Sequence, residues 1–229
     1  MIQYGLISQT DARCIEKTLD LVCSQFPDEI ISTLEVGVFD GGTSRGIYEY
    51  VTSKTYDEMV DPPEPPIYTI NRKCYHTAID NEKDKLVKPP FPECNFIRGN
   101  SNEVYNQLQD ESQHFIFFDG CHCFTCVIAD VFAYAPKIKV GGFACFHDTG
   151  KHIKKFKDFQ HGDKNNPDAY ISVRKSLQII NMLKVKVIEN GWKVLYEYIG
   201  NKNNQWQLIF DEADPENEAG GVCVFQKLY

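Results

Sequence analysis

Residues 34–44 read LEVGVFDGGTS, an apolar run that ends in an acidic residue and a pair of glycines. The run begins at Ile31 and has the length and the β-branched content of a buried strand. The glycine pair allows a tight turn, and Thr43 or Ser44 is placed to cap a helix over residues 45–52. A strand, a loop and a helix N-terminus in this order are typical of a site for a nucleotide-like ligand.

The glycine spacing in this loop distinguishes two classes of nucleotide ligand. A dinucleotide fingerprint requires glycine two residues after Gly37, where this chain has Phe39. Glu35 brings a carboxylate next to the loop, where it repels phosphates and attracts a cationic centre such as a sulfonium. The loop therefore favours S-adenosylmethionine over NAD, and a plain strand–turn–helix without a ligand is the alternative.

The composition predicts one globular domain over residues 1–229, because 42% of the residues are hydrophobic and 24% are charged. A formal net charge of −8 argues against a general nucleic-acid or anionic-membrane binder. The chain also lacks a run of about 18 apolar residues, the length that crosses a membrane. No secretory signal pattern starts the sequence, so we expect its nine cysteines to be reduced thiols in the cytoplasm.

Strand and helix patterns alternate along the chain. An amphipathic helix is expected over residues 11–26, before the first strand. Further strands are expected over residues 76–80, 94–98, 114–120 and 141–148, and further helices over residues 103–109, 124–134 and 171–183. This alternation predicts an α/β, Rossmann-like fold, in which helices cover both faces of a mostly parallel sheet and ligands bind at the carboxyl ends of the strands.

Two segments interrupt the alternation, and two strands are expected at its end. Residues 54–73 contain DPPEPP, which neither a helix nor a central strand accommodates, so we interpret them as an inserted loop. Residues 151–170 lack periodicity and are expected to form a second inserted loop, mobile over the active face. Residues 192–199 and 221–228 are interpreted as the last two strands, separated by a polar stretch.

With these pieces in order, the sequence resembles a class I S-adenosylmethionine-dependent methyltransferase, in the branch with macrocin-type sugar O-methyltransferases and cephalosporin-hydroxylase-like proteins. The resemblance rests on LEVGVFDGGTS, AIDNE, FIRGNS and the long segment from FFDGCHCF to CFHDTG, and it runs from about Glu35 to Asp148. It implies a seven-stranded sheet with an antiparallel last strand. It also implies S-adenosylmethionine as cofactor and a hydroxylated small molecule or sugar as methyl acceptor.

The resemblance assigns cofactor contacts to this chain. The loop after the first strand is expected to hold the methionine end, Asp80 the ribose hydroxyls, and Asn100 with Ser101 the adenine. For Asp80 the alternative is a solvated carboxylate at a strand end, and for Asn100 a plain role in a turn. The candidate cofactor-binding residues are Glu35, Gly37, Asp40, Gly41, Ser44, Asp80, Asn100, Ser101, Asp119, Gly120 and His122.

Asp119, His147 and Asp148 form a second group, because the ends of neighbouring strands bring their side chains together. In the enzymes that the sequence resembles, this is a divalent-metal site. Magnesium, manganese and zinc are the candidates, and an imidazole ligand suits magnesium least. His122 follows Asp119 by three residues, and we interpret these two as the catalytic residues, with His122 as the general base. Whether a metal binds, and whether His122 only shapes the pocket, stays open.

The spacing of Cys121, Cys123 and Cys126 is that of C-x-C-x-x-C, which binds soft metals when a fourth ligand is near. We expect these thiols instead to be buried as small apolar side chains. Three functions are weighed: an O-methyltransferase, with or without metal assistance, a metal-dependent oxygenase or hydroxylase, and a non-catalytic cofactor-binding module. The expected partner is a small hydroxylated acceptor, with neither nucleic acid nor membrane, and assembly into a homo-oligomer is left open.

Overall fold

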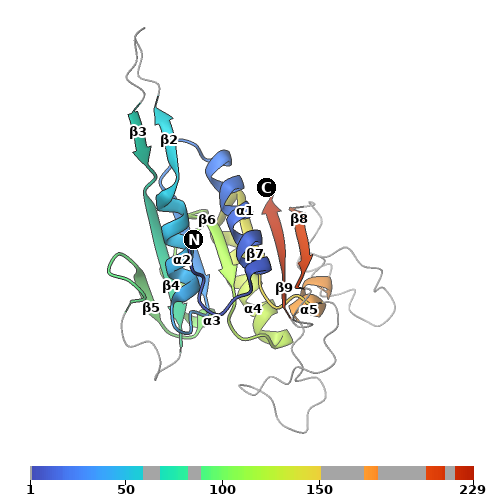
Figure 1. The fold of residues 1–229 in the computed structure, drawn as a ribbon. Helices are drawn as coiled ribbons and strands as arrows, with labels where there is room; N and C mark the ends of the chain where they lie inside the picture. The colour runs from blue at the N-terminus through green and yellow to red at the C-terminus, as the bar shows by residue number, and fades with distance from the viewer. Residues whose placement is uncertain (1, 59–67, 82–88, 151–172, 180–204, 215–219) are drawn as a thin grey trace.

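The computed structural model describes residues 2–58, 68–81, 89–150, 173–179, 205–214 and 220–229. Its main sheet consists of β1 Ile31–Val36, β4 Cys74–Asp80, β5 Asn95–Arg98, β6 Gln113–Phe118, β7 Ile138–Phe146, β8 Trp206–Ala213 and β9 Gly221–Lys227. Their spatial order is β5-β4-β1-β6-β7-β9-β8 (Figure 1). The first five are parallel, and β9 runs antiparallel to both of its neighbours. The predicted seven-stranded, mostly parallel sheet is confirmed.

Helices cover both faces of this sheet (Figure 1). They are α1 Gln9–Gln25, α2 Gly42–Ser53, α3 Ser101–Val104, α4 Phe124–Tyr134 and α5 Val173–Ile179, with short 3-10 turns at Tyr105–Gln107 and Ala135–Lys137. Side chains of α1 and α2 belong to one buried cluster, and those of α4 and α5 belong to another. The sheet therefore lies between two helical layers, as the alternation of the sequence predicts.

The alternating side chains of β6 explain how one strand serves both layers. Phe115 and Phe117 are fully buried in the cluster with α1 and α2. Ile116 and Phe118 point the other way, into the cluster with α4 and α5. Successive side chains of a strand face opposite sides of a sheet, so an uninterrupted apolar run such as FIFF at residues 115–118 is typical of a strand that is covered on both faces.

The carboxyl ends of the central strands meet at one edge of the sheet. Beyond the last paired residues, the amide of Asp119 donates to the carbonyl of Val36 at 2.8 Å. The amide of His147 donates to the carbonyl of Phe118 at 3.0 Å. These two hydrogen bonds hold Asp119, after β6, and His147, after β7, beside each other and next to the end of β1. They therefore fix the backbone from which both polar side chains extend.

The segment 54–73 differs from the expected loop. Thr55–Glu58 forms β2 and Tyr68–Asn71 forms β3, and the two pair antiparallel as a separate two-stranded sheet (Figure 1). The prediction of a loop rests on the proline-rich residues 61–66, and these lie outside the described residues. The flanks contain threonine, tyrosine and isoleucine, which favour extended backbone, and these residues pair with each other.

The end of the chain also departs from the prediction. β9 is confirmed, but its partner β8 lies at Trp206–Ala213, inside the stretch that was interpreted as a polar connection. β8 is the edge strand of the sheet, where a strand needs few buried side chains, so its sequence shows little apolar alternation. The expected strand 192–199 and the loop 151–170 lie outside the described residues.

Two expectations from composition can be compared with the structure. All nine cysteines lie in the described part of the chain, and none of them forms a disulfide bond there. In the part of the chain that the structure describes, no helix has both the length and the apolar character that a membrane span requires.

Candidate active site

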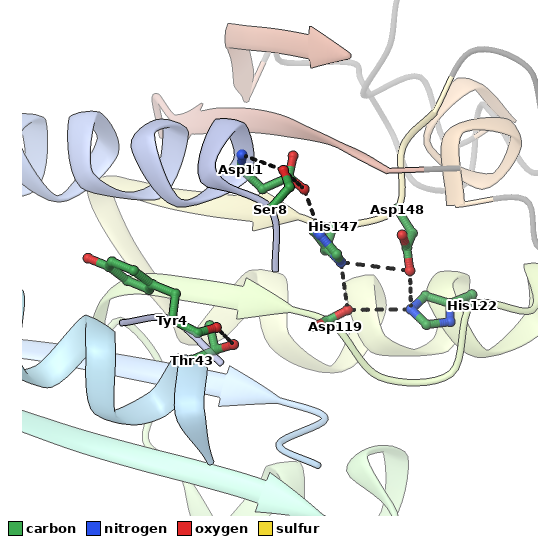
Figure 2. A network of polar contacts seen from close by, with 8 residues as sticks. All are labelled: Tyr4, Ser8, Asp11, Thr43, Asp119, His122, His147 and Asp148. Carbon is green, nitrogen blue, oxygen red and sulfur yellow. Dashed lines mark hydrogen bonds and ion pairs between the residues drawn. The ribbon is translucent and has the colours of Figure 1, made fainter. Parts of the chain in front are cut away.

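Four predicted site residues lie together at the carboxyl edge of the sheet (Figure 2). Asp119 directly follows β6, His147 and Asp148 directly follow β7, and His122 belongs to the loop between β6 and α4. The Nδ1 atom of His147 lies 3.0 Å from Oδ1 of Asp119. The Nε2 atom of His122 lies 3.4 Å from the same oxygen and 3.0 Å from Oδ2 of Asp148. Two carboxylates and two imidazoles thus form one continuous polar cluster.

Asp11 extends this cluster into the first turn of α1, and the sequence did not reveal it. Its Oδ2 atom lies 3.2 Å from Nε2 of His147 and accepts a hydrogen bond from the Ser8 hydroxyl at 2.9 Å (Figure 2). The Asp11 side chain is only 2% exposed, and its Oδ1 atom has no hydrogen-bond partner among the described residues. In the sequence, Ser8 and Asp11 are typical of the start of a helix. No local signal indicates that this start lies beside the carboxyl ends of β6 and β7.

Opposite charges govern the protonation of the cluster. Burial alone would lower the pKa of His147, but Asp119 and Asp11 outweigh it and raise that pKa well above its usual value. The pKa of His122 is also raised, because Asp119 and Asp148 outweigh burial. Burial would raise the pKa of Asp119, yet the two histidines hold it well below its usual range. For Asp148 burial prevails over the histidines and raises the pKa.

The donor set fits a divalent cation. Ligand atoms of Asp119, His122 and Asp148 all lie within 4.8 Å of one another. His147 reaches the same carboxylates from another direction, with Nδ1 3.7 Å from Oδ2 of Asp148. Its contact with Asp11 is the carboxylate–histidine pairing that orients metal-binding imidazoles. Oxygen and imidazole ligands together suit manganese, iron or zinc better than magnesium.

The backbone is unusual at two points of this edge. Asp148 has a φ angle of 52° and Phe39 one of 51°, both in the left-handed region that non-glycine residues rarely adopt. Asp148 lies in the segment that leaves β7, and Phe39 in the loop after β1. Such conformations persist where the surrounding structure holds them, and they gather at functional sites.

The glycines of the loop after β1 are needed by the protein itself. Gly37 has a φ angle of 87°, and a Cβ atom there would lie 2.4 Å from the carbonyl oxygen of Asp119. Gly41 has a φ angle of 80°, and its Cβ would lie 2.6 Å from that of Pro90. The side chain of Asp40 accepts a hydrogen bond from the amide of Gly42 at 2.9 Å. The loop is therefore closely packed against its neighbours and is held in one shape.

Glu35 and Ser44 lie beneath this loop. The Ser44 hydroxyl donates to the Glu35 carboxylate, and both side chains are buried. Burial raises the pKa of Glu35 well above its usual value, and the bond from Ser44 offsets only part of this. The expected capping of α2 by Thr43 or Ser44 is wrong: Gly41 is the N-cap, and the Thr43 hydroxyl donates to the carbonyl of Tyr4 at 3.1 Å.

The remaining candidates for cofactor binding follow the same edge. Oδ2 of Asp80, at the end of β4, accepts hydrogen bonds from the amides of Val38 and Phe39 at 2.7 and 3.0 Å. Asn100 is the N-cap of α3, and the Ser101 hydroxyl donates to Asp130 at 2.5 Å. Asp130, which the sequence did not single out, is buried, and burial raises its pKa to about 6.

A small pocket opens beside these groups. It has a volume of about 10 Å³, near the room that one water molecule needs. Its lining residues are Phe118, Gly120, Cys121, His122, Val127, Asp130, Phe146 and Val173. Gly120 and His122 therefore line a cavity of the size of a single water molecule.

Comparison with known proteins agrees with this geometry. Residues 34–149, just over half of the chain, match the family model described as a methyltransferase domain. The chain belongs to this methyltransferase family. The matched span contains the loop after β1, the end of β4 and the polar cluster at the ends of β6 and β7. Among curated proteins, none matches the sequence significantly.

Solved structures of O-methyltransferases share the fold of this methyltransferase. NovP is 11% identical, with a TM-score of 0.53 over 99% of this chain and 83% of its own. The Bacillus cereus enzyme in complex with SAH is also 11% identical, with a TM-score of 0.51 over 99% and 84%. MycE, in complex with Mg and SAH, is 13% identical, with a TM-score of 0.51 over 91% and 48%. The predicted class I S-adenosylmethionine-dependent methyltransferase fold is confirmed.

Proposed function

We propose that this methyltransferase transfers the methyl group of S-adenosylmethionine to a hydroxyl oxygen of a small molecule or sugar, with the assistance of a divalent cation. The observation that supports this most is the meeting of Asp119, His122, His147 and Asp148 at the carboxyl edge of a methyltransferase sheet. The oxygenase alternative has no comparable support, because the family match is to methyltransferases.

The chemistry of the edge suits S-adenosylmethionine. Bound there, it would supply a methyl group on a positively charged sulfur, and the carboxylates of Asp40, Asp80 and Asp119 favour such a cation. The N-cap residue of α2, Gly41, has no side chain, and the carboxylate of Asp40 bonds the amide of Gly42, the first residue of the helix. We assign the methionine end to the loop after β1, the ribose hydroxyls to Asp80, and the adenine to Asn100 and Ser101.

We assign the cation to Asp119, His147 and Asp148. Asp11 bonds the far nitrogen of His147 and so holds the imidazole toward the two carboxylates. A cation at this point would lower the pKa of an acceptor hydroxyl. His122 is the general base in this proposal, because it faces the pocket and its side chain is 27% exposed, against 11% for His147.

We also propose a small hydroxylated acceptor and a cytoplasmic location. A small hydroxylated molecule fits an acidic chain with a formal net charge of −8 better than a nucleic acid does. Nine free thiols fit a reducing compartment such as the cytoplasm.

Replacement of Asp148 by alanine tests the role of the cation. Because Asp148 is assigned to the cation and also contacts His122, but is not assigned to the cofactor, we expect Asp148→Ala to lower turnover of a hydroxylated acceptor at least about 100-fold, while the dissociation constant of S-adenosylmethionine changes less than about threefold. Release of SAH from a panel of catechols, phenols and sugars gives the turnover, and calorimetry gives the affinity. Asp28→Ala, at an exposed position in a turn, is the matched control. Undiminished turnover in Asp148→Ala would contradict the assignment.

A further inference from the structure

Three cysteines form a compact thiol cluster next to the candidate active site. Cys121 lies in the loop after β6, Cys123 is the N-cap of α4, and Cys126 lies in the first turn of that helix. Their sulfur atoms all lie within 4.8 Å of one another. The C-x-C-x-x-C spacing therefore brings three soft ligand atoms together. Cysteines that serve only as small buried side chains do not need to lie this close to one another.

The exposure of the cluster distinguishes it from the other cysteines. Cys123 is buried, as expected. Cys121 and Cys126 are partly exposed, so the expectation of burial is wrong for these two. The remaining cysteines are all buried: Cys14, Cys23, Cys74, Cys94, Cys145 and Cys223. A thiol that serves as a small apolar side chain has no need of access to solvent. An ion in solution can thus reach the cluster.

We propose that the thiol cluster binds a thiophilic divalent metal ion, of which zinc is the representative, through the sulfur atoms of Cys121, Cys123 and Cys126. Tetrahedral zinc with sulfur ligands at about 2.3 Å holds neighbouring sulfurs about 3.8 Å apart, so the cluster needs only small side-chain movements. Binding is not a redox step: each coordinating thiol releases its proton to solvent, and the metal keeps its charge.

The surroundings favour thiolates at this place. The sulfur of Cys123 stands at the N-terminus of α4, an eleven-residue helix whose dipole stabilises negative charge. It lies 3.5 Å from the hydroxyl oxygen of Thr125. The helix end and the Thr125 hydroxyl therefore favour a thiolate at Cys123.

The fourth position of a tetrahedral site would go to a water molecule or to a neighbouring carboxylate. Asp130 follows Cys126 by one turn of α4, and it lines the same small pocket as Cys121. Zinc accepts a carboxylate or a water molecule beside three thiolates. The thiol cluster differs from the oxygen and imidazole ligands of Asp119, His147 and Asp148, so it prefers softer ions than that site does.

Cobalt(II) is the probe that reports thiolate ligation directly. We expect the reduced, metal-stripped full chain to bind Co²⁺ with the intense thiolate-to-cobalt charge-transfer absorption of one equivalent at the thiol cluster, and Zn²⁺ in excess over both proposed metal sites to abolish that absorption. In Cys121→Ser/Cys126→Ser the absorption should fall at least about tenfold. Asp148→Ala is the matched control: it should retain the absorption, because oxygen and nitrogen ligands do not produce it.

A second measurement does not depend on how the variants fold. Alkylation of the wild-type chain by iodoacetamide, followed by peptide mass spectrometry, gives the rate at each cysteine. Zn²⁺ should slow the modification of Cys121 and Cys126 at least about tenfold. Absence of the charge-transfer absorption in the wild type, its persistence in the double variant, or alkylation rates unaffected by Zn²⁺ would each overturn the proposal. None of these results depends on methyl transfer.

Discussion

Asp11 brings helix α1 into the candidate active site. Its carboxylate is almost fully buried and lies 3.2 Å from Nε2 of His147, the imidazole that faces Asp119 on its other side. A buried carboxylate in this position fixes the orientation of the ring and raises its basicity. At the scale of single residues, the site therefore depends on Asp11, which lies outside the sequence motifs that predicted the rest of the site.

We predict that Asp11→Asn weakens the binding of Mn²⁺ about 10- to 100-fold. A neutral amide can orient the imidazole of His147, but it does not raise the basicity of that imidazole as a carboxylate does. The affinity for SAH should stay within about threefold of the wild type. Calorimetry with each ligand measures both effects.

Ser8→Ala is the control for this substitution, since Ser8 caps α1 and bonds Asp11 without touching His147. It should cost about 1 kcal/mol of stability and leave the affinity for Mn²⁺ unchanged. Equal Mn²⁺ affinities for Asp11→Asn and the wild type would show that Asp11 serves only the helix end.

Strand β4 contains a buried histidine that links stability to pH. His76 is 1% exposed, and burial lowers its pKa to about 3. Its Nδ1 atom lies 2.8 Å from the hydroxyl oxygen of Thr33, and its Nε2 atom has no partner in the described part of the chain. In the unfolded chain the same side chain has a pKa near ~6.5. Between these two values only the unfolded state is protonated, so acid favours unfolding.

We predict that the free energy of unfolding falls as pH is lowered from about 6.5 toward 3, with His76 contributing about 1.4 kcal/mol per pH unit. His76→Gln should remove this part of the slope, since glutamine does not titrate. Urea denaturation of both proteins at pH 7.5, 6.5 and 5.5 measures it. Parallel pH profiles for the two proteins would contradict the buried, neutral state of His76.

The elements themselves were predictable where burial is two-sided. β6 contains the unbroken apolar run 115–118, and α4 was predicted at residues 124–134, the bounds that the structure gives. β8 was missed, although it contains the apolar run 208–210, because its apolar and polar residues do not alternate as they do in a half-buried strand. The pairing of β2 with β3 was missed. Residues that favour extended backbone indicate a strand only when the strand they pair with is also known.

At the scale of the whole molecule, the parallel sheet explains which site residues the sequence could reveal. Asp119 and the pair His147 and Asp148 each follow a strand, so a parallel arrangement of neighbouring strands is enough to bring them together. Asp11 and Asp130 come from helices. Their positions depend on how those helices pack on the sheet, and a single sequence holds no local signal for that contact.

Calorimetric titration of the metal-stripped chain with S-adenosylmethionine and with SAH, each repeated with Mg²⁺, Mn²⁺ and Zn²⁺, tests the proposed function most directly. We predict micromolar binding of both ligands, and a cation-binding event that Asp148→Ala abolishes while SAH still binds. Failure of both ligands to bind under every condition would contradict the proposed S-adenosylmethionine-dependent methyl transfer.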